Sequence, residues 1–186
     1  MRVRYIQATL VGLALALLHR EAGAEEVAAK TPEPSLSAAW IITQAVPSPE
    51  LAFGNEGTRF GLRWQVTPAL YSFGVHRRVS PWRFFVVDPI ARQSGSLEWH
   101  VSPELWTSGT LDGAFRSGVR AYFPIHHRGE YLSCSLGTSA FLFRDEVHAS
   151  YDLGIYAFSG VIGLETAVSP SSDALRGIVT LKLRYF

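Results

Sequence analysis

Apolar and polar residues alternate along most of the chain from residue 58 onward. In the first such stretch Phe60, Leu62 and Trp64 alternate with Arg59 and Arg63. A period of two places successive side chains on opposite sides of an extended chain, so the stretch predicts a β-strand with one apolar and one polar face. Further strands are predicted at residues 82–92, 94–106, 114–124, 130–143, 147–158, 161–168 and 175–186. The alternation is poor in 82–92, where the prediction depends on aromatic and β-branched content.

The alternation changes phase once, at Pro68. Phe60 and Leu62 belong to the apolar face before this point, whereas Tyr71 and Phe73 belong to it afterwards. A shift of one residue is what a β-bulge produces, and proline fits a bulge because it has no N–H to donate to the sheet. We therefore interpret residues 58–76 as one long bulged strand, with two separate strands as the alternative.

The strand count predicts an all-β fold: an antiparallel, up-and-down transmembrane β-barrel over residues 57–186. Counted with the bulged strand, the strands number eight, and each is near the ~9–11 residues that cross a bilayer at a tilt. An even count returns both ends of the chain to the same side of a membrane. Residues 25–56 contain several prolines and predict a periplasmic or plug-like segment. If the segment around Pro68 is two strands, the count is nine, and a further strand at residues 36–46 would then give ten.

Residues 1–24 have the features of a cleaved export signal. Arg2 and Arg4 precede an apolar run at residues 8–18, and small residues at 22–24 suit signal peptidase, with cleavage expected after Ala24. The apolar run is shorter than the ~20 residues of a membrane-spanning helix. The sequence therefore predicts an exported protein.

Composition narrows the possible functions. The chain has 17 basic and 16 acidic residues, a balance that argues against nucleic-acid binding. Cys134 is the single cysteine, so no intrachain disulfide can form, and no set of Cys and His has the spacing of zinc ligands. We expect no metal and no cofactor.

The polar faces of the predicted strands carry most of the charged residues of the barrel. Eight strands enclose an interior only wide enough for side chains, and an unpaired buried charge is costly. We therefore predict a plugged lumen filled by ion pairs, with no open channel. The residues expected in this network are Arg59, Arg63, Glu98, His100, Arg116, Arg120 and Asp152.

Aromatic and basic residues near the predicted strand ends suit a membrane surface. Aromatic rings with a polar edge favour the interface between lipid and water. The aromatic residues in question are Tyr71, Phe73, Trp82, Trp106, Phe141 and Tyr185. Arg77, Arg78 and Arg144 are expected at the outer rim, where they would contact lipopolysaccharide phosphates.

The last eight residues, Val-Thr-Leu-Lys-Leu-Arg-Tyr-Phe at 179–186, resemble the terminal strand of bacterial outer-membrane β-barrel proteins. This resemblance implies an integral protein of the cell outer membrane, surrounded by lipid and lipopolysaccharide. It also implies that the barrel assembly machinery recognises the strand ending at Phe186. The alternative is a soluble periplasmic binding barrel, whose strands would also alternate.

His148-Ala149-Ser150 has a spacing similar to that of the outer-membrane lipid A deacylases, which are also small barrels. The resemblance implies a base at His148, a nucleophile at Ser150, and Asp152 or Glu165 as the carboxylate that orients the histidine. A strand places residues i and i+2 on one face, as this chemistry requires.

The neighbouring residues argue against such an enzyme. Val147 and Tyr151 belong to the apolar face of the same strand, which turns His148 and Ser150 toward the interior, away from any lipid substrate. We therefore favour a hydrogen-bond network in the lumen and a non-enzymatic structural or interaction role, with a lipid A-modifying hydrolase as the alternative.

Overall fold

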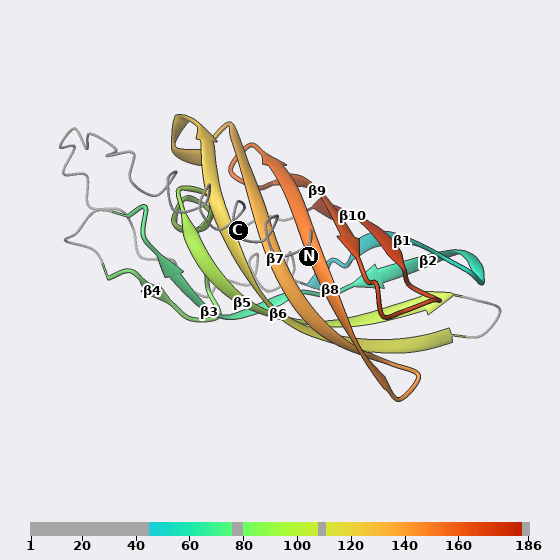
Figure 1. Ribbon diagram of the computed structural model, residues 1–186. Coiled ribbons are helices and arrows are strands. Elements are labelled where there is room, and N and C mark those ends of the chain that lie inside the picture. The colour runs from blue at the N-terminus through green and yellow to red at the C-terminus, as the bar shows by residue number, and fades with distance from the viewer. Residues whose placement is uncertain (1–44, 76–79, 108–110, 184–186) are drawn as a thin grey trace, which may run out of the picture. The chain divides into compact units, whose positions relative to one another are not determined.

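Eight antiparallel strands close into a barrel in the computed structural model, which describes residues 45–75, 80–107 and 111–183 (Figure 1). These residues all belong to one compact unit, residues 33–186. The strands are β1 (Ser48–Gly54), β2 (Gly57–Arg63), β3 (Val66–Ser72), β4 (Trp82–Arg83), β5 (Ser96–Thr107), β6 (Leu111–His126), β7 (Leu132–Phe143), β8 (Glu146–Ala157), β9 (Ile162–Val168) and β10 (Gly177–Leu183). The predicted all-β antiparallel barrel is confirmed.

The barrel closes because β2 pairs with β1 on one side and with β5 on the other. The paired residues can be followed once around the wall, from Ser96 back to β5 at Trp106. The path runs through Tyr122, Ser135, Gly154, Glu165, Thr180, Glu50 and Gly61. The circuit returns ten residues further along β5, a stagger that corresponds to strands tilted by roughly 40°.

The predicted bulge at Pro68 is also confirmed. β2 and β3 pair in sequence along β5, with Arg63 opposite Glu104 and Val66 opposite Val101. The register then shifts by one residue between Val66 and Ala69. β2 and β3 therefore act as one long strand of the wall, whose second half extends beyond the barrel and pairs with β4 (Figure 1).

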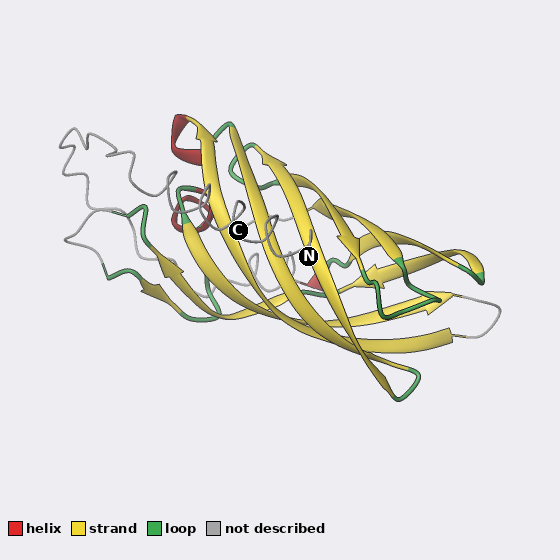
Figure 2. Ribbon diagram, in the orientation of Figure 1, coloured by secondary structure: helices red, strands yellow, loops and turns green. Residues whose placement is uncertain are grey.

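The prediction of a strand over residues 82–92 is wrong. Only Trp82 and Arg83 form a strand, and the chain then enters the short helix α3 (Pro89–Gln93). The side chain of Asp88 accepts a hydrogen bond from the Ile90 N–H, and Pro89 occupies the first turn. Both features are typical of the start of a helix, so the sequence itself indicated a helix at this point. Figure 2 shows α3 and the 3-10 turn η1 (His127–Gly129) at the end of the barrel where β3 and β4 lie.

The place of the missing strand is taken by β1, which lies within the segment 25–56 that the sequence assigned outside the barrel. The wall therefore begins at Ser48 and still has eight strands. The predicted leader and residues 36–44 of the possible ninth or tenth strand lie outside the described residues. Among the residues that are described, no helix is long and apolar enough to cross a membrane.

Candidate functional site in the barrel interior

The two faces of the wall differ in chemistry. Outward positions of the wall strands are mostly apolar and exposed, as Phe60, Trp99, Val119, Leu153 and Leu181 illustrate. Inward positions are mostly polar and buried. In the described part of the chain the buried charged residues are five carboxylates and six cations: Glu50, Glu98, Glu104, Asp152, Glu165, Arg59, Arg63, Arg92, Arg116, Arg120 and Lys182.

One group of charges centres on Glu104, a residue of β5. Its carboxylate lies 2.6 Å from Nε of Arg116 on β6 and 2.9 Å from Nε of Arg63 on β2. Arg63 also lies 2.6 Å from Glu50 on β1. Arg116 donates a further hydrogen bond to Ser139 on β7, at 3.1 Å. Five consecutive strands of the wall, β1, β2, β5, β6 and β7, are therefore joined by these contacts.

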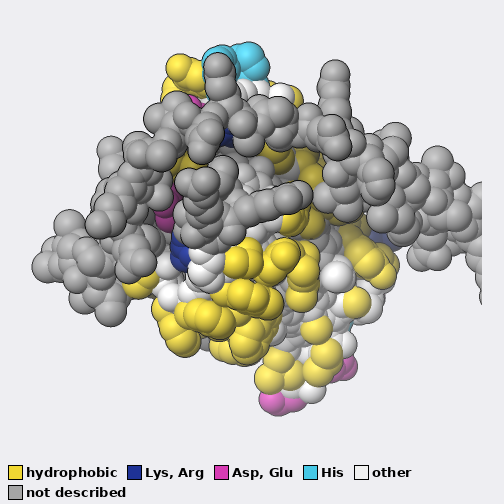
Figure 3. Space-filling view, turned by 90° about the vertical axis from the view of Figure 1, so that its left-hand side faces the viewer, with side chains coloured by type: hydrophobic (Ala, Val, Ile, Leu, Met, Phe, Trp, Pro, Cys, Tyr) yellow, Lys and Arg dark blue, Asp and Glu magenta, His cyan; other side chains and the backbone are white. Residues whose placement is uncertain are grey.

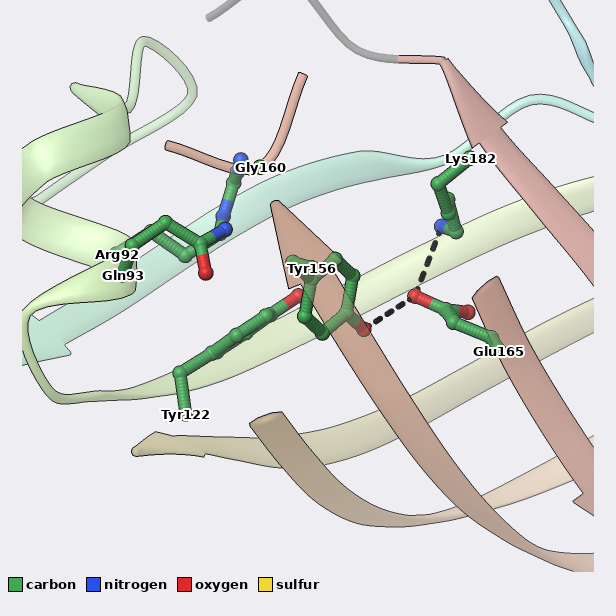
Figure 4. A pocket seen from close by; sticks show the side chains of 7 residues that line it. All are labelled: Arg92, Gln93, Tyr122, Tyr156, Gly160, Glu165 and Lys182. Atoms are coloured by element: carbon green, nitrogen blue, oxygen red, sulfur yellow. Dashed lines mark hydrogen bonds and ion pairs between the residues drawn. The ribbon is translucent and has the colours of Figure 1, made fainter. Parts of the chain in front are cut away.

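A second group centres on Glu165, a residue of β9 (Figure 4). Its carboxylate accepts a hydrogen bond from the Tyr156 hydroxyl at 2.6 Å and lies 2.5 Å from Arg120 and 3.5 Å from Lys182. Arg120 binds Asp152 at 2.8 Å through Nε. The guanidinium of Arg120 thus bridges two carboxylates that stand on different strands.

α3 covers one end of this network. Arg92 lies 3.3 Å from Glu98, and Gln93 accepts a hydrogen bond from Ser133. Gly129 and Gly160, in the β6–β7 and β8–β9 turns, pack so closely against Gln93 that a side chain at either position would collide with it. A cavity of about 10 Å³ remains between α3 and the Glu165 group, at the lower limit for a single water molecule.

The other end of the interior is apolar. Trp106 and Phe141 are almost completely buried there, so their predicted place at a membrane interface is wrong. Both are in phase with inward residues of their strands, Trp106 with Glu104 and Phe141 with Ser139. The cluster consists of Ala52, Trp106, Phe141, Phe143, Ala167, Ala174, Leu175 and Ile178.

The loop at residues 169–176 supplies part of this apolar cluster. Asp173 accepts a hydrogen bond from the Asn55 N–H at 2.8 Å, and Ser171 accepts one from the Ala149 N–H at 3.0 Å. The loop is therefore held to the β1–β2 turn on one side and to β8 on the other. Leu175 is 0% exposed, and it fills the interior beneath the loop.

His148 and Ser150 both face the interior, as the phase of β8 predicts. Nδ1 of His148 lies 2.9 Å from the carbonyl oxygen of Ser171, and the Ser150 hydroxyl is buried with no hydrogen-bond partner in the described part of the chain. Asp152 is engaged by Arg120. The structure places the three residues on one face but joins neither carboxylate, Asp152 or Glu165, to His148 by any contact between described residues.

The remaining residues of the predicted network are also inside. Arg59, Arg63, Glu98, His100, Arg116 and Arg120 are all buried. His100 differs from the others because neither ring nitrogen has a hydrogen-bond partner among the described residues. Arg59 lies at the rim, where it pairs with Glu56 and Asp112.

Arg144 occupies the exposed β7–β8 turn. It lies 2.9 Å from Asp112 and 3.1 Å from Glu56, so its charge is already paired within the protein. The hydrogen bond from Arg144 to Asp112, followed by that to Glu56, raises the pKa of the guanidinium. Arg77 and Arg78, the other two predicted contacts for lipopolysaccharide, lie outside the described residues.

Sequence reasoning missed several members of the network. Glu104 continues the inward phase of Glu98 and could have been assigned from that phase. Glu50 was missed because its segment was predicted to lie outside the barrel. Arg92 was missed because its segment was predicted to be a strand. In the described part of the chain, no group of three or more His, Cys, Asp or Glu side chains could hold a metal ion.

Comparison with known proteins adds no further constraint. No family model, curated protein or solved structure matches this chain. The distribution of polar and apolar groups in the barrel is therefore the main indication of function.

Proposed function

We propose that this protein is an integral outer-membrane β-barrel with a closed lumen and a structural or interaction role, and without enzymatic activity. The observation that carries the proposal is the reversed polarity of the wall. Water-soluble proteins bury their apolar side chains, because exposing them costs about 25 cal/mol per Å² of apolar surface. Here the outward positions carry Phe, Trp, Leu and Val, while buried carboxylates and guanidinium groups fill the inside.

A lipid environment accounts for both faces at once. Hydrocarbon solvates the outward side chains, and each of the eight strands of the closed wall pairs with a neighbour on both sides within the described residues. β10 supports this reading, because Leu181 and Leu183 point outward while Lys182 points into the network. Recognition of the chain end at Phe186 by the barrel assembly machinery, and contact of Arg144 with lipopolysaccharide phosphates, are further parts of the proposal.

The closed lumen is supported by three layers of side chains. The apolar cluster fills one end, the Glu104 and Glu165 groups fill the centre, and α3 covers the other end. We therefore expect no stable open steps when the protein is placed in a planar bilayer. Reproducible conductance steps would overturn the closed lumen while leaving the membrane location intact.

The alternative of a lipid A hydrolase gains no support from the geometry. A lipid-cleaving nucleophile must reach lipid, yet Ser150 is 0% exposed and lies inside the wall. The outward neighbours Val147 and Tyr151 occupy the lipid-facing side. The inward direction of His148 and Ser150 instead suits a structural polar network.

A pair of arginine substitutions tests the membrane location. Leu153 lies near the middle of β8 on the outward face, and Val147 lies on the same face near the end of the strand. Leu153→Arg should destabilise a membrane barrel by about 2–4 kcal/mol, whereas Val147→Arg should cost about 0–1 kcal/mol near the interface. Stability would be measured by urea titration of the heat-modifiable gel mobility in reconstituted vesicles.

The control is the unsubstituted protein, which should fractionate with outer membranes and change its gel mobility on boiling. In a water-soluble barrel an exposed leucine tolerates arginine, so Leu153→Arg would then be as harmless as Val147→Arg. Equal stability of the two variants, together with recovery of the protein in the soluble fraction, would overturn the proposal in favour of a soluble binding barrel.

A further inference from the structure

The part of the sheet that extends beyond the barrel carries a concentrated set of exposed aromatic residues. We use the name "wing" for β3, β4 and residues 84–85 (Figure 1). Tyr71 and Trp82 form an edge-to-face pair with their ring centroids 5.1 Å apart, and Phe84 stacks on Trp82 at 6.2 Å. Phe73 and Phe85 are exposed beside them. Figure 3 views this end of the molecule and shows hydrophobic side chains gathered on its face.

One residue of the wing, Phe85, has a strained backbone conformation. Phe85 has a φ of 57°, a left-handed conformation that is unfavourable for a residue other than glycine. The conformation is held by a hydrogen bond from the Phe85 N–H to the carbonyl of Thr67, at 3.1 Å. Phe84 and Phe85 are both about 60% exposed. A cluster of exposed rings beside a strained backbone residue suggests that something covers it.

Residues of the described chain already cover the inner side of the wing. On its inner side, Leu70 is buried with Val87 and Ala91, the last a residue of α3. The hydroxyl of Ser72 donates a hydrogen bond to the carbonyl of Ala91 at 2.7 Å. α3 therefore fixes the wing from behind and presents its aromatic face outward.

The outer side of the wing is continuous with the apolar outer face of the barrel. Tyr71 pairs with Leu97 and Ala69 pairs with Trp99 on β5, and both β5 residues are exposed outward positions. The hairpin tips at the other end of the barrel instead carry the ion pairs of Glu56, Asp112 and Arg144. Phe53, Phe60 and Phe115 are exposed toward that end, so the wing is distinguished by its paired Tyr71 and Trp82, whose rings have a polar edge.

We infer that the wing is a membrane anchor at one end of the barrel, where β1 begins and β10 ends. Its aromatic face contacts the headgroup region of the bilayer. The inference rests on the proposed function, because the same lipid must surround the barrel wall. Aromatic rings with polar edges favour that depth, and an anchor at one end only would fix the direction and depth of the barrel in the membrane.

Fluorescence quenching by brominated lipids tests the inference with two residues of this chain. Trp82 reports on the wing and Trp99 on the wall, and both are about half exposed. The protein would be reconstituted in phosphatidylcholine vesicles brominated either near the headgroup or near the chain end. The contribution of each tryptophan is obtained from the difference between the parent protein and its Trp82→Phe or Trp99→Phe variant, which avoids removing the buried Trp106.

We expect lipid to quench both tryptophans, with the ratio of shallow to deep quenching roughly twofold higher for Trp82 than for Trp99. Quenching of Trp99 without Trp82 would overturn the anchor and leave the membrane barrel standing, and it would point to a protein partner for the wing. Quenching of Trp82 at the same depth as Trp99 would also overturn it. Quenching of neither residue would overturn the proposed function itself.

Discussion

The two ends of the barrel interior contain side chains of different chemistry. At one end, Leu175 of the loop at residues 169–176 belongs to the same apolar cluster as Trp106 and Phe141. At the other end α3 turns Arg92 and Gln93 inward, where they meet Glu98 and Ser133. Between the ends, the charges of the Glu104 and Glu165 groups join nearly all strands of the wall.

The difference determines how each region responds to change. Apolar packing is non-directional, so the loss of one side chain costs the area and the cavity that it leaves. A network of buried charges needs all its partners, because a buried charge that loses a neighbour is poorly solvated. The charged centre should therefore be the most sensitive region of the protein, and the apolar end should be less so.

The largest effect is expected from Glu165→Leu. The substitution leaves Arg120, Lys182 and the Tyr156 hydroxyl without the carboxylate that they share. Removal of one partner from a buried charge pair destabilises a protein by about 3–5 kcal/mol, and two cations depend on this residue. We expect a large fall in the urea midpoint of the heat-modifiable band, or no folded band at all.

Two variants of the same strand serve as controls. Glu165→Gln retains the size and hydrogen-bonding capacity of the side chain, so it should be less harmful than leucine. Leu164→Ala removes an outward side chain of similar bulk and should be better tolerated than either. If Glu165→Leu matched the stability of the parent protein, the charged centre would not hold the wall together.

A smaller effect is expected from Leu175→Ala at the apolar end. The buried side chain lies within the cluster of Trp106 and Ile178, and its truncation leaves a cavity that the strands cannot fill. A change of this kind costs about 2–4 kcal/mol in a rigid core, and a loop residue is expected at the lower limit. Urea titration measures the change, and Leu164→Ala is again the matched control. Equal stability of the two variants would show that packing of Leu175 does not stabilise this end of the barrel.

Much of the wall could be predicted from the sequence because period-two alternation is a local signal. The phase change at Pro68 gave the bulge, and Phe60, Val147 and Tyr151 were assigned to the correct face. The strand over 82–92 failed because a run of aromatic residues was weighed above Asp88 and Pro89, which start a helix. β1 was missed because its prolines suggested a break, although Pro49 is accommodated within the strand.

The interior could be predicted only as far as phase decides it. Phase places Arg116 and Arg120 inside, but it does not state which carboxylate each will meet across the lumen. Those pairs depend on the stagger of ten residues around the wall, a long-range quantity. Trp106 and Phe141 were placed at a membrane interface because they are aromatic. Their positions in the strands are inward, and both side chains are buried. The sequence therefore indicated the faces, whereas the partners and the apolar end required the structure.

The smallest effect is expected at a glycine that makes room for the charged centre. A Cβ added to Gly137 on β7 would lie 2.5 Å from an oxygen of Asp152, the carboxylate that binds Arg120. Because that carboxylate is the end of a movable side chain, Gly137→Ala should cost only about 1–2 kcal/mol. Gly113→Ala on β6 is the control, since a Cβ there meets nothing within 4 Å.

A double variant separates the ion pair from general crowding at this position. If Gly137 exists to let Asp152 reach Arg120, the cost of Gly137→Ala should largely disappear in an Asp152→Ala background, because the group that collides is gone. Urea titrations of the two single variants and the double variant give the coupling directly. A cost of Gly137→Ala that is the same with and without Asp152 would mean that the glycine serves the curvature of β7, and that the charged centre does not depend on it.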